Sequence, residues 1–232
     1  MTITISAFAW VPPFAQGYVK DIRPRWALAE AGLGYDVHLL REGDADAPDY
    51  RAWQPFGQVP AYRDERVELF ESGAILLHVA ERSTALRPWD AQEAAQTRAW
   101  TFAALNSVEP KVDALILPGV FHAGEAWVAG HRPHAERLMD LRLRSLAGWL
   151  GGRDWLTGRF GVADIAMATV LRGLQDEPVL AGHPTVAAYL ARCLARPAFE
   201  AARAAQMATF AENAPVLPDR PQAAAEHARS AS

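Results

Sequence analysis

The sequence of 232 residues is poor in cysteine, and Cys193 is the only one. A single cysteine excludes an intramolecular disulfide and a Cys-x-x-Cys redox pair, so any thiol chemistry must use a thiol that the protein binds. Cys193 shares an apolar stripe of helical spacing with Val186, Tyr189 and Leu190. We therefore expect Cys193 to be a buried packing residue.

The sequence also lacks an excess of basic charge. Its 23 Lys and Arg residues stand against 27 Asp and Glu residues, which gives a formal net charge of -4. Without a Lys/Arg-rich run, we expect no nucleic acid and no membrane as a partner. Residues 1–6 lack the basic segment and long apolar core of a secretory signal, and no apolar run reaches membrane-spanning length. These absences favour a cytoplasmic protein.

Clusters of metal ligands are missing as well. His131 and His134 are three residues apart, but Pro133 lies between them and no carboxylate cluster is nearby in the sequence. We therefore expect no metal. What the sequence does contain is 50% hydrophobic and 22% charged residues, an ordinary composition for a packed protein.

One stretch of the first 80 residues indicates a ligand site. Val59-Pro60 opens a short apolar strand, and Asp64-Glu65 supplies a turn into a second strand ending at Phe70, so a β-hairpin is predicted. Ser72 then stands at a cap position before apolar residues of helical spacing. The first amides of such a helix can receive a carboxylate, and the neighbouring Glu71 suits an ammonium group.

The order and spacing of Val59-Pro60 and Glu71-Ser72 resemble the N-terminal, thioredoxin-like domain of cytosolic glutathione transferases. The resemblance implies that Pro60 is cis and that the Val59 backbone pairs with the cysteinyl part of glutathione. It also implies that Glu71 and Ser72 hold the γ-glutamyl ammonium and carboxylate, with Gln58 at the same site. We expect a bacterial member of the family, of no assigned class.

The rest of the chain fits an α/β thioredoxin-like N-terminal domain followed by an all-α C-terminal helical bundle. The predicted domains are 1–82, which binds glutathione, and 90–212, which is all-helical, joined by a linker over 83–89; residues 213–232 are predicted to form a disordered tail. In the first domain we expect β-α-β, a loop, and β-β-α. In the second, helices are predicted over 91–108 and 135–150, with a partly helical, buried connection over 110–133.

A later segment carries a second point of resemblance. With Gly161 as the cap, Asp164 occupies the third position of a nearly all-apolar helix, where the family has a capping box. The family usually has Ser or Thr in place of Gly161. Only half of the reciprocal box is therefore expected, and Asp164 is predicted to serve folding rather than catalysis.

The catalytic residue is harder to assign. The family activates the thiol with a hydroxyl or a cysteine between the first strand and the first helix, but this loop is longer than the common pattern by roughly six residues. Counting back from the helix places Tyr18 there, and Tyr18 is the only hydroxyl-bearing residue of the loop. The alternatives are the Gln16 amide and the backbone N–H groups over 14–17.

The resemblance implies a glutathione transferase whose thiolate attacks a small hydrophobic electrophile, with glutathione as co-substrate and a homodimer as the assembly. We expect Trp10, Phe14 and Trp127 to line the pocket of the second substrate. Two alternatives stay open. One is a non-catalytic ligand- or partner-binding protein of the same fold, and the other is a glutathione-dependent peroxidase, disulfide reductase or dehalogenase.

Overall fold

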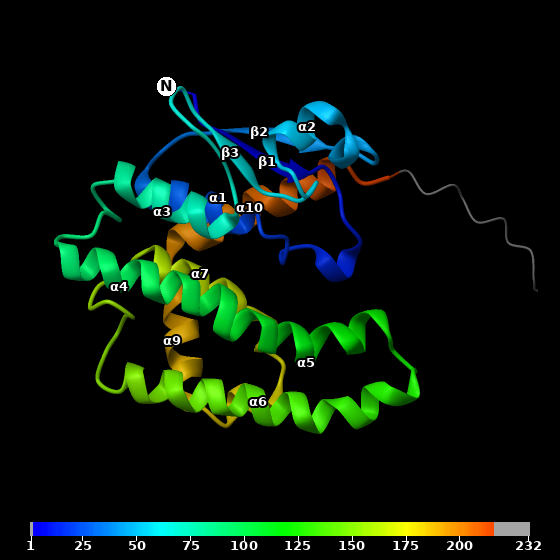
Figure 1. Ribbon diagram of the computed structural model, residues 1–232, viewed down its shortest axis with the longest axis vertical. Helices are drawn as coiled ribbons and strands as arrows, with labels where there is room; N and C mark the ends of the chain where they lie inside the picture. Colours follow the sequence, from blue (N-terminus) through cyan, green and yellow to red (C-terminus); the bar gives the residue numbers. More distant parts are fainter. Residues whose placement is uncertain (1, 216–232) are drawn as a thin grey trace, which may run out of the picture.

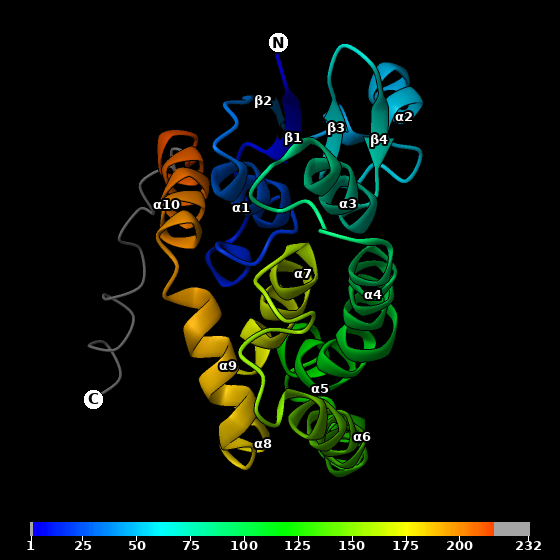
Figure 2. The ribbon, with the colours of Figure 1, turned by 90° about the vertical axis from the view of Figure 1, so that its left-hand side faces the viewer.

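The computed structural model describes residues 2–215, which form a small sheet with its helices above a helical bundle (Figures 1 and 2). The elements of the first half are β1 (Thr4–Phe8), a 3-10 turn η1 (Pro13–Ala15), α1 (Ile22–Ala31), β2 (Asp36–Leu40), η2 (Asp44–Asp46), α2 (Pro48–Trp53), β3 (Ala61–Arg63), β4 (Glu68–Phe70) and α3 (Ser72–Arg82). This order confirms the predicted β-α-β, loop, β-β-α arrangement.

The sheet is mixed, with the strand order β2-β1-β3-β4. β1 runs parallel to β2 and antiparallel to β3, and β3 and β4 form the predicted hairpin. Helices α1 and α3 pack against each other below the sheet in Figure 1, while α2 lies above it. Ile5 and Trp26 are fully buried, so the lower face of the sheet shares one core with α1 and α3.

Helices make up the second half. They are α4 (Ala91–Phe102), a π-helical turn η3 (Ala103–Val108), α5 (Glu109–Phe121), α6 (Ala126–Leu150), α7 (Val162–Leu171), a 3-10 turn η4 (Arg172–Leu174), α8 (Pro178–Ala181), α9 (Pro184–Leu194) and α10 (Pro197–Glu212). Residues 83–90, between α3 and α4, form no helix or strand. Of the predicted tail, residues 216–232 lie outside the described residues.

Two helix boundaries differ from the predictions. The helix predicted over 91–108 is regular only to Phe102, because six residues of π-helix follow before α5 begins. The helix predicted from Ala135 begins at Ala126 instead and continues through Pro133. Its first turns are held against α5, since His131 Nε2 lies 2.8 Å from the carbonyl oxygen of Ala114. This tertiary contact outweighs the missing N–H of the proline.

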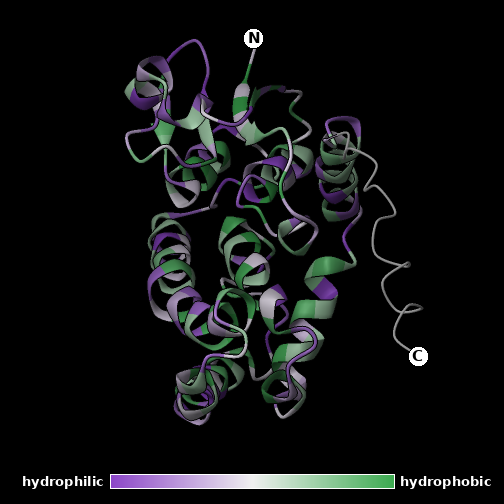
Figure 3. Ribbon diagram, turned by 90° about the vertical axis from the view of Figure 1, so that its right-hand side faces the viewer, coloured by the Kyte–Doolittle hydropathy of each residue, from purple (hydrophilic) through white to green (hydrophobic). Residues whose placement is uncertain are grey.

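Helix α7 lies at the centre of the second half, and Figure 3 shows the central ribbon there as predominantly hydrophobic. Nine of its ten residues are buried. Asp164 accepts the Gly161 amide at 3.0 Å, which confirms the predicted half of the capping box. It also accepts the Leu156 amide at 3.0 Å and the Tyr189 hydroxyl at 2.8 Å, so it joins α7 to α9 and to the preceding loop.

Helix α10 returns to the first half and packs along α1, as Figure 2 shows. Gln206 of α10 donates to the carbonyl oxygen of Val19 at 3.1 Å and to the Asp21 carboxylate at 2.5 Å. Asp21 in turn pairs with Arg25 at 2.7 Å, and all these side chains are buried. The two halves therefore share a polar interface in addition to their apolar core.

Candidate functional site

A cavity of about 210 Å³ lies between the two halves of the chain. It is lined by Lys20, Arg23, Gln54, Gln58, Val59, Pro60, Glu71, Ser72, Leu105, Asn106 and Glu109. All five residues predicted to bind glutathione, which are Gln58, Val59, Pro60, Glu71 and Ser72, line this cavity. The structure thus brings two motifs that are about ten residues apart into one site, and it adds residues from α1 and from the helical half.

The segment around Val59-Pro60 is fixed from the strand and helix beside it. The Val59-Pro60 peptide is cis, as predicted. The Ala61 amide donates to Ser6 Oγ at 2.7 Å, and the Tyr50 hydroxyl donates to the Gln58 carbonyl oxygen. Burial raises the pKa of Tyr50, which keeps its hydroxyl a donor. The backbone that enters and leaves the proline therefore has a defined position at the cavity wall.

Glu71 has an unusual backbone conformation, with a φ of 71°. A positive φ costs a residue other than glycine of order 1–3 kcal/mol and is concentrated at functional sites. The structure also corrects one prediction, since Glu71 is the N-cap of α3 and Ser72 is its first helical residue. Ser72 is buried at the start of the helix, while the Glu71 side chain is exposed at the cavity.

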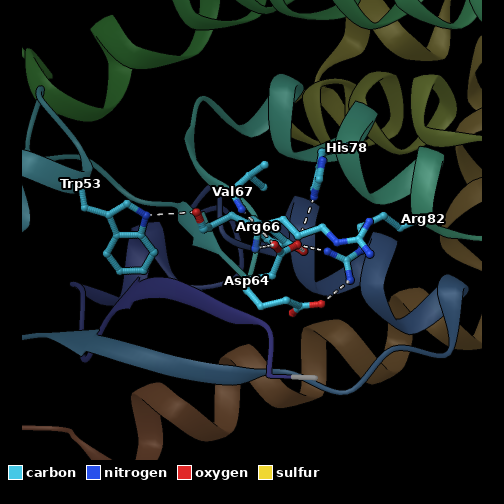
Figure 4. A network of polar contacts seen from close by, with 8 residues as sticks. Trp53, Asp64, Arg66, Val67, His78 and Arg82 are labelled. Atoms are coloured by element: carbon cyan, nitrogen blue, oxygen red, sulfur yellow. Dashed lines mark hydrogen bonds and ion pairs between the residues drawn. The ribbon is translucent and has the colours of Figure 1, made fainter.

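The position of α3 depends on a carboxylate at the tip of the hairpin (Figure 4). Asp64 accepts hydrogen bonds from the backbone amides of Arg66 and Val67 and from the side chains of Tyr62, His78 and Arg82. Burial opposes the ionisation of Asp64, yet these donors together hold its pKa well below the usual range. Since His78 and Arg82 belong to α3, this network fixes the helix whose first turn faces the cavity.

Arg23 of α1 connects Ser72 to the helical half. Its Nη1 donates to Ser72 Oγ at 2.9 Å, its Nη2 to Glu109 Oε1 at 2.7 Å and its Nε to Thr169 Oγ1 at 3.0 Å. Because the Ser72 oxygen accepts from Arg23, its own hydrogen can be donated to a group in the cavity. Ser72 is therefore oriented to donate to an anion.

The charges at the cavity have both signs. Lys20 lies 3.2 Å from Glu109, and Arg23 lies 2.7 Å from the same carboxylate, whereas Glu71 has no ion pair within the described part of the chain. The cavity therefore offers a carboxylate for an ammonium group, and it offers Ser72 and the start of α3 for a carboxylate. Such a site suits a small zwitterion.

Sequence reasoning did not find Lys20, Arg23, Asn106 or Glu109. Arg23 precedes the buried Trp26 by three residues, so an arginine on the buried stripe of α1 was the available signal. Gly73 lies close to the helical half, since a Cβ atom there would lie 2.5 Å from Leu105 Cδ1. Glycine at this position leaves room for the Leu105 side chain beside the first turn of α3.

The loop between β1 and α1 holds the candidate thiol donors. Tyr18 is 50% exposed, and its ring lies 4.9 Å from the guanidinium of Arg172; it is not one of the residues that line the cavity. Gln16 Nε2 donates to the carbonyl oxygen of Val11 at 3.0 Å. Tyr18 therefore lies on the face of the loop that is turned toward Arg172. The Gln16 amide is hydrogen-bonded within the loop.

The three predicted pocket residues have different surroundings. Trp10 is partly buried. Phe14 is exposed, and its ring meets Phe121 of α5 edge-to-face at 5.7 Å, so it faces the helical half. Trp127 of α6 is exposed, and its Nε1 donates to Glu125 at 2.7 Å. Phe14 is thus the one for which the structure gives a contact between the halves.

Cys193 is fully buried, and burial raises the pKa of its thiol far above the usual range. This confirms that it is a packing residue. Among residues 2–215 there is no group of three or more His, Cys, Asp and Glu side chains that could hold a metal ion. Over the same residues, no helix is both long enough and apolar enough to cross a membrane.

Two family models match the chain. The glutathione S-transferase N-terminal domain matches residues 17–81, and the C-terminal domain matches residues 126–197. A rice protein (Oryza sativa subsp. japonica) named probable glutathione S-transferase GSTF2 is 30% identical over 190 residues, which cover 73% of this chain and 84% of the relative. The disulfide-bond oxidoreductase YghU of Escherichia coli (strain K12) is 35% identical over 82 residues, covering 33% of this chain and 28% of YghU.

Solved structures share the fold. A glutathione transferase from Burkholderia graminis, with two glutathione molecules bound per subunit, has a TM-score of 0.76 at 24% identity and covers 87% of both chains. One from Pseudomonas putida, with glutathione disulfide bound, has a TM-score of 0.76 at 23% identity, covering 87% of this chain and 90% of that one. The predicted fold, a thioredoxin-like half followed by a helical half, is confirmed.

Proposed function

Because the chain belongs to the glutathione S-transferase family, we propose that it binds glutathione in the 210 Å³ cavity and uses the glutathione thiolate to attack a small hydrophobic electrophile. The single observation that carries this proposal is the meeting of the cis Val59-Pro60 segment with Glu71 and Ser72 in one cavity. The same reaction also needs an apolar site for the electrophile, which we assign to Trp10, Phe14 and Trp127.

Glutathione would lie along the cavity in one direction. Its γ-glutamyl ammonium would meet the Glu71 carboxylate, and its γ-glutamyl carboxylate would accept from Ser72 and from the first amides of α3. The cysteinyl part would pair with the backbone of Val59, beside Gln58. This placement leaves the sulfur on the side of the loop between β1 and α1.

The reaction begins with loss of the thiol proton to solvent, since the thiolate is the nucleophile. Sulfur then forms a bond to an electrophilic carbon, and either a leaving group departs with its bonding electrons or, in an addition, the adjacent atom takes up a proton. Tyr18 is our proposed donor to the thiolate. The competing donors are the backbone amides over 14–17 and Gln16, which would have to leave its bond to the Val11 carbonyl oxygen.

Calorimetry with glutathione tests the site. We expect Glu71→Ala and Ser72→Ala to weaken binding about tenfold each, because each removes a charged or charge-assisted contact. Glu68→Ala is the matched control, since Glu68 is an exposed glutamate three residues before Glu71 and does not line the cavity. Equal affinities in all four proteins would refute the assignment of the cavity.

Titration of the bound thiol tests the chemistry. Thiolate absorbance against pH should give a pKa well below the reference value of about 8.5 when glutathione is bound to the wild-type protein. If glutathione binds and its thiol pKa is unshifted, the alternative of a non-catalytic ligand-binding protein is favoured. The expected loss of the shift in Tyr18→Phe would assign the donor, and an unchanged titration would transfer that role to the backbone or Gln16.

A glutathione-dependent disulfide reductase is the second candidate. It is favoured by the similarity to YghU, which is named a disulfide-bond oxidoreductase. In that reaction two glutathione molecules reduce a disulfide and leave as glutathione disulfide. Product analysis separates the two, since a transferase yields a thioether and no glutathione disulfide.

We also propose that the protein is a cytoplasmic homodimer acting in detoxification, and that its origin is bacterial. The dimer is supported by exposed aromatic residues on the first half. Phe56 is 62% exposed, and its ring lies 6.1 Å from that of Phe70 on the edge strand β4. Exposed apolar side chains beside a sheet edge favour contact with another chain.

A further inference from the structure

Arg172 is a buried cation without an anionic partner. It lies at the end of α7, and only 6% of its surface is exposed. Within residues 2–215 it makes no ion pair, although the other buried arginines of the interface, Arg23 and Arg25, each have a carboxylate within 2.7 Å. Burial lowers the pKa of Arg172, and the charge of Arg203 lowers it further, while the nearby Glu200 carboxylate partly offsets the shift. A buried, unpaired charge is expensive and therefore indicates a role.

The contacts of Arg172 converge on the loop between β1 and α1. Its Nη1 donates to the carbonyl oxygen of Gly17 at 2.8 Å. Its guanidinium carbon lies 4.9 Å from the ring centre of Tyr18 and 5.0 Å from that of Phe199 on α10. The guanidinium thus holds one peptide group of the loop and one side chain next to it.

The turn at Gly17 is shaped to receive this side chain. Gly17 has a φ of 83°, a conformation that residues with a Cβ atom rarely adopt. A Cβ atom there would lie 3.7 Å from Arg172 Nη2. Glycine is therefore favoured by the backbone conformation of the turn, while a Cβ atom would make only an ordinary contact with the guanidinium.

The loop has few other anchors near this point. Gln206 of α10 donates to the carbonyl oxygen of Val19 at 3.1 Å, two residues further on, and the exposed Phe14 ring meets Phe121 of α5 at 5.7 Å. Arg172 directly follows α7, the helix at the centre of the second half, and begins η4. The loop is consequently positioned from the helical half.

We propose that Arg172 is a positioning residue for the glutathione reaction, which holds the turn at residues 16–18 so that the thiol donor of this loop meets the sulfur. The inference rests on the proposed function, but it does not depend on whether the donor is Tyr18 or a backbone amide over 14–17. Both kinds of donor belong to the segment that Arg172 fixes. The helical half would then take part in thiol activation as well as in binding the electrophile.

The test compares Arg172→Met, which removes the hydrogen bond and the charge, with Arg172→Lys, which keeps the charge. Arg196→Met is the matched control. Arg196 pairs with Glu30 of α1 at 2.6 Å and lies over Phe160, so it too joins the halves, but it does not touch the loop. Turnover, the KM for glutathione, the pKa of the bound thiol and hydrogen exchange over residues 16–22 are measured in all variants.

For Arg172→Met we expect kcat to fall at least about tenfold with the glutathione KM within about twofold, because the γ-glutamyl contacts are intact and the donor is displaced. The bound-thiol pKa should rise toward about 8.5. Exchange over 16–22 should accelerate, and Arg172→Lys should recover part of the turnover. Arg196→Met should leave all four quantities near wild type.

Wild-type kcat and thiol pKa in Arg172→Met would overturn the inference, and so would the same losses in Arg196→Met. If Arg172→Met does not fold, Gly17→Ala perturbs the same turn from the loop side, and its wild-type behaviour would be equally decisive. A wild-type protein that binds no glutathione would remove the proposed function and this inference together. Unchanged loop exchange in Arg172→Met would remove the inference alone, whatever the activity.

Discussion

The role of Arg23 gives the sharpest prediction about the cavity. The change is Arg23→Met, which retains length and loses the guanidinium. Three hydrogen bonds disappear, to Ser72, Glu109 and Thr169, all from a side chain that is 4% exposed. Removing one partner of a buried ion pair costs about 3–5 kcal/mol. The lower end applies, because Glu109 keeps Lys20 at 3.2 Å and Thr169 Oγ1 still donates to the Ala166 carbonyl oxygen at 2.9 Å.

The same change should weaken glutathione binding. Without the Arg23 donor, the Ser72 hydroxyl can turn its hydrogen away from the cavity. The loss of one charge-assisted contact corresponds to about a tenfold rise in the Kd for glutathione. Urea unfolding measures the loss of stability, and calorimetry on the folded protein measures the change in Kd for glutathione.

Arg25→Met is the control for both measurements. Arg25 is equally buried and pairs with Asp21 at 2.7 Å, but it does not line the cavity. It should lose comparable stability and keep wild-type affinity. The reasoning is refuted if Arg23→Met binds glutathione like wild type, or if Arg25→Met loses as much affinity as Arg23→Met.

Two further predictions concern folding and assembly. Burial raises the pKa of Asp164 from 3.8 to about 6, so the protonated form is favoured in the folded state and the stability it contributes below pH 3.8 is lost as pH rises through about 6. Relative to Asp164→Asn, wild-type stability in urea should therefore fall by up to about 1.4 kcal/mol per pH unit across that window, and parallel pH profiles would contradict this. Phe56→Ser should raise the dissociation constant of the proposed dimer in sedimentation, with the exposed Trp127→Ser as control; identical values for Phe56→Ser and wild type would remove Phe56 from the interface.

The parts of the site that the sequence predicted are those in which local chemistry decides position. Val59-Pro60 and Glu71-Ser72 lie at the two ends of one hairpin, so the turn at Asp64 fixes their relation within about a dozen residues. The nearly all-apolar sequence of α7 likewise reflects a helix that is buried on all sides. These elements followed from pattern because few distant contacts are needed to specify them.

The missed residues depend on contacts between distant segments. Arg23 and Glu109 are 86 residues apart, and Arg23 and Thr169 are 146 apart, so no local pattern predicts their pairing. The π-helical turn that contains Asn106 falls within the helix predicted over 91–108, because nothing in its composition distinguishes it from a regular helix. The early start of α6 has the same origin, since it depends on His131 contacting α5.

These contacts also bear on which half of the chain binds which substrate. The resemblance assigns glutathione to the first half and the electrophile to the second, yet Glu109 and Asn106 line the cavity proposed for glutathione from the second half. The two halves approach closely at Gly73, where an added Cβ atom would lie 2.5 Å from Leu105 Cδ1 and the end of the Leu105 side chain would have to move. The proposed glutathione site is therefore complete only when the two halves are packed together, and its affinity for glutathione should depend on that packing as well as on Val59-Pro60 and Glu71-Ser72.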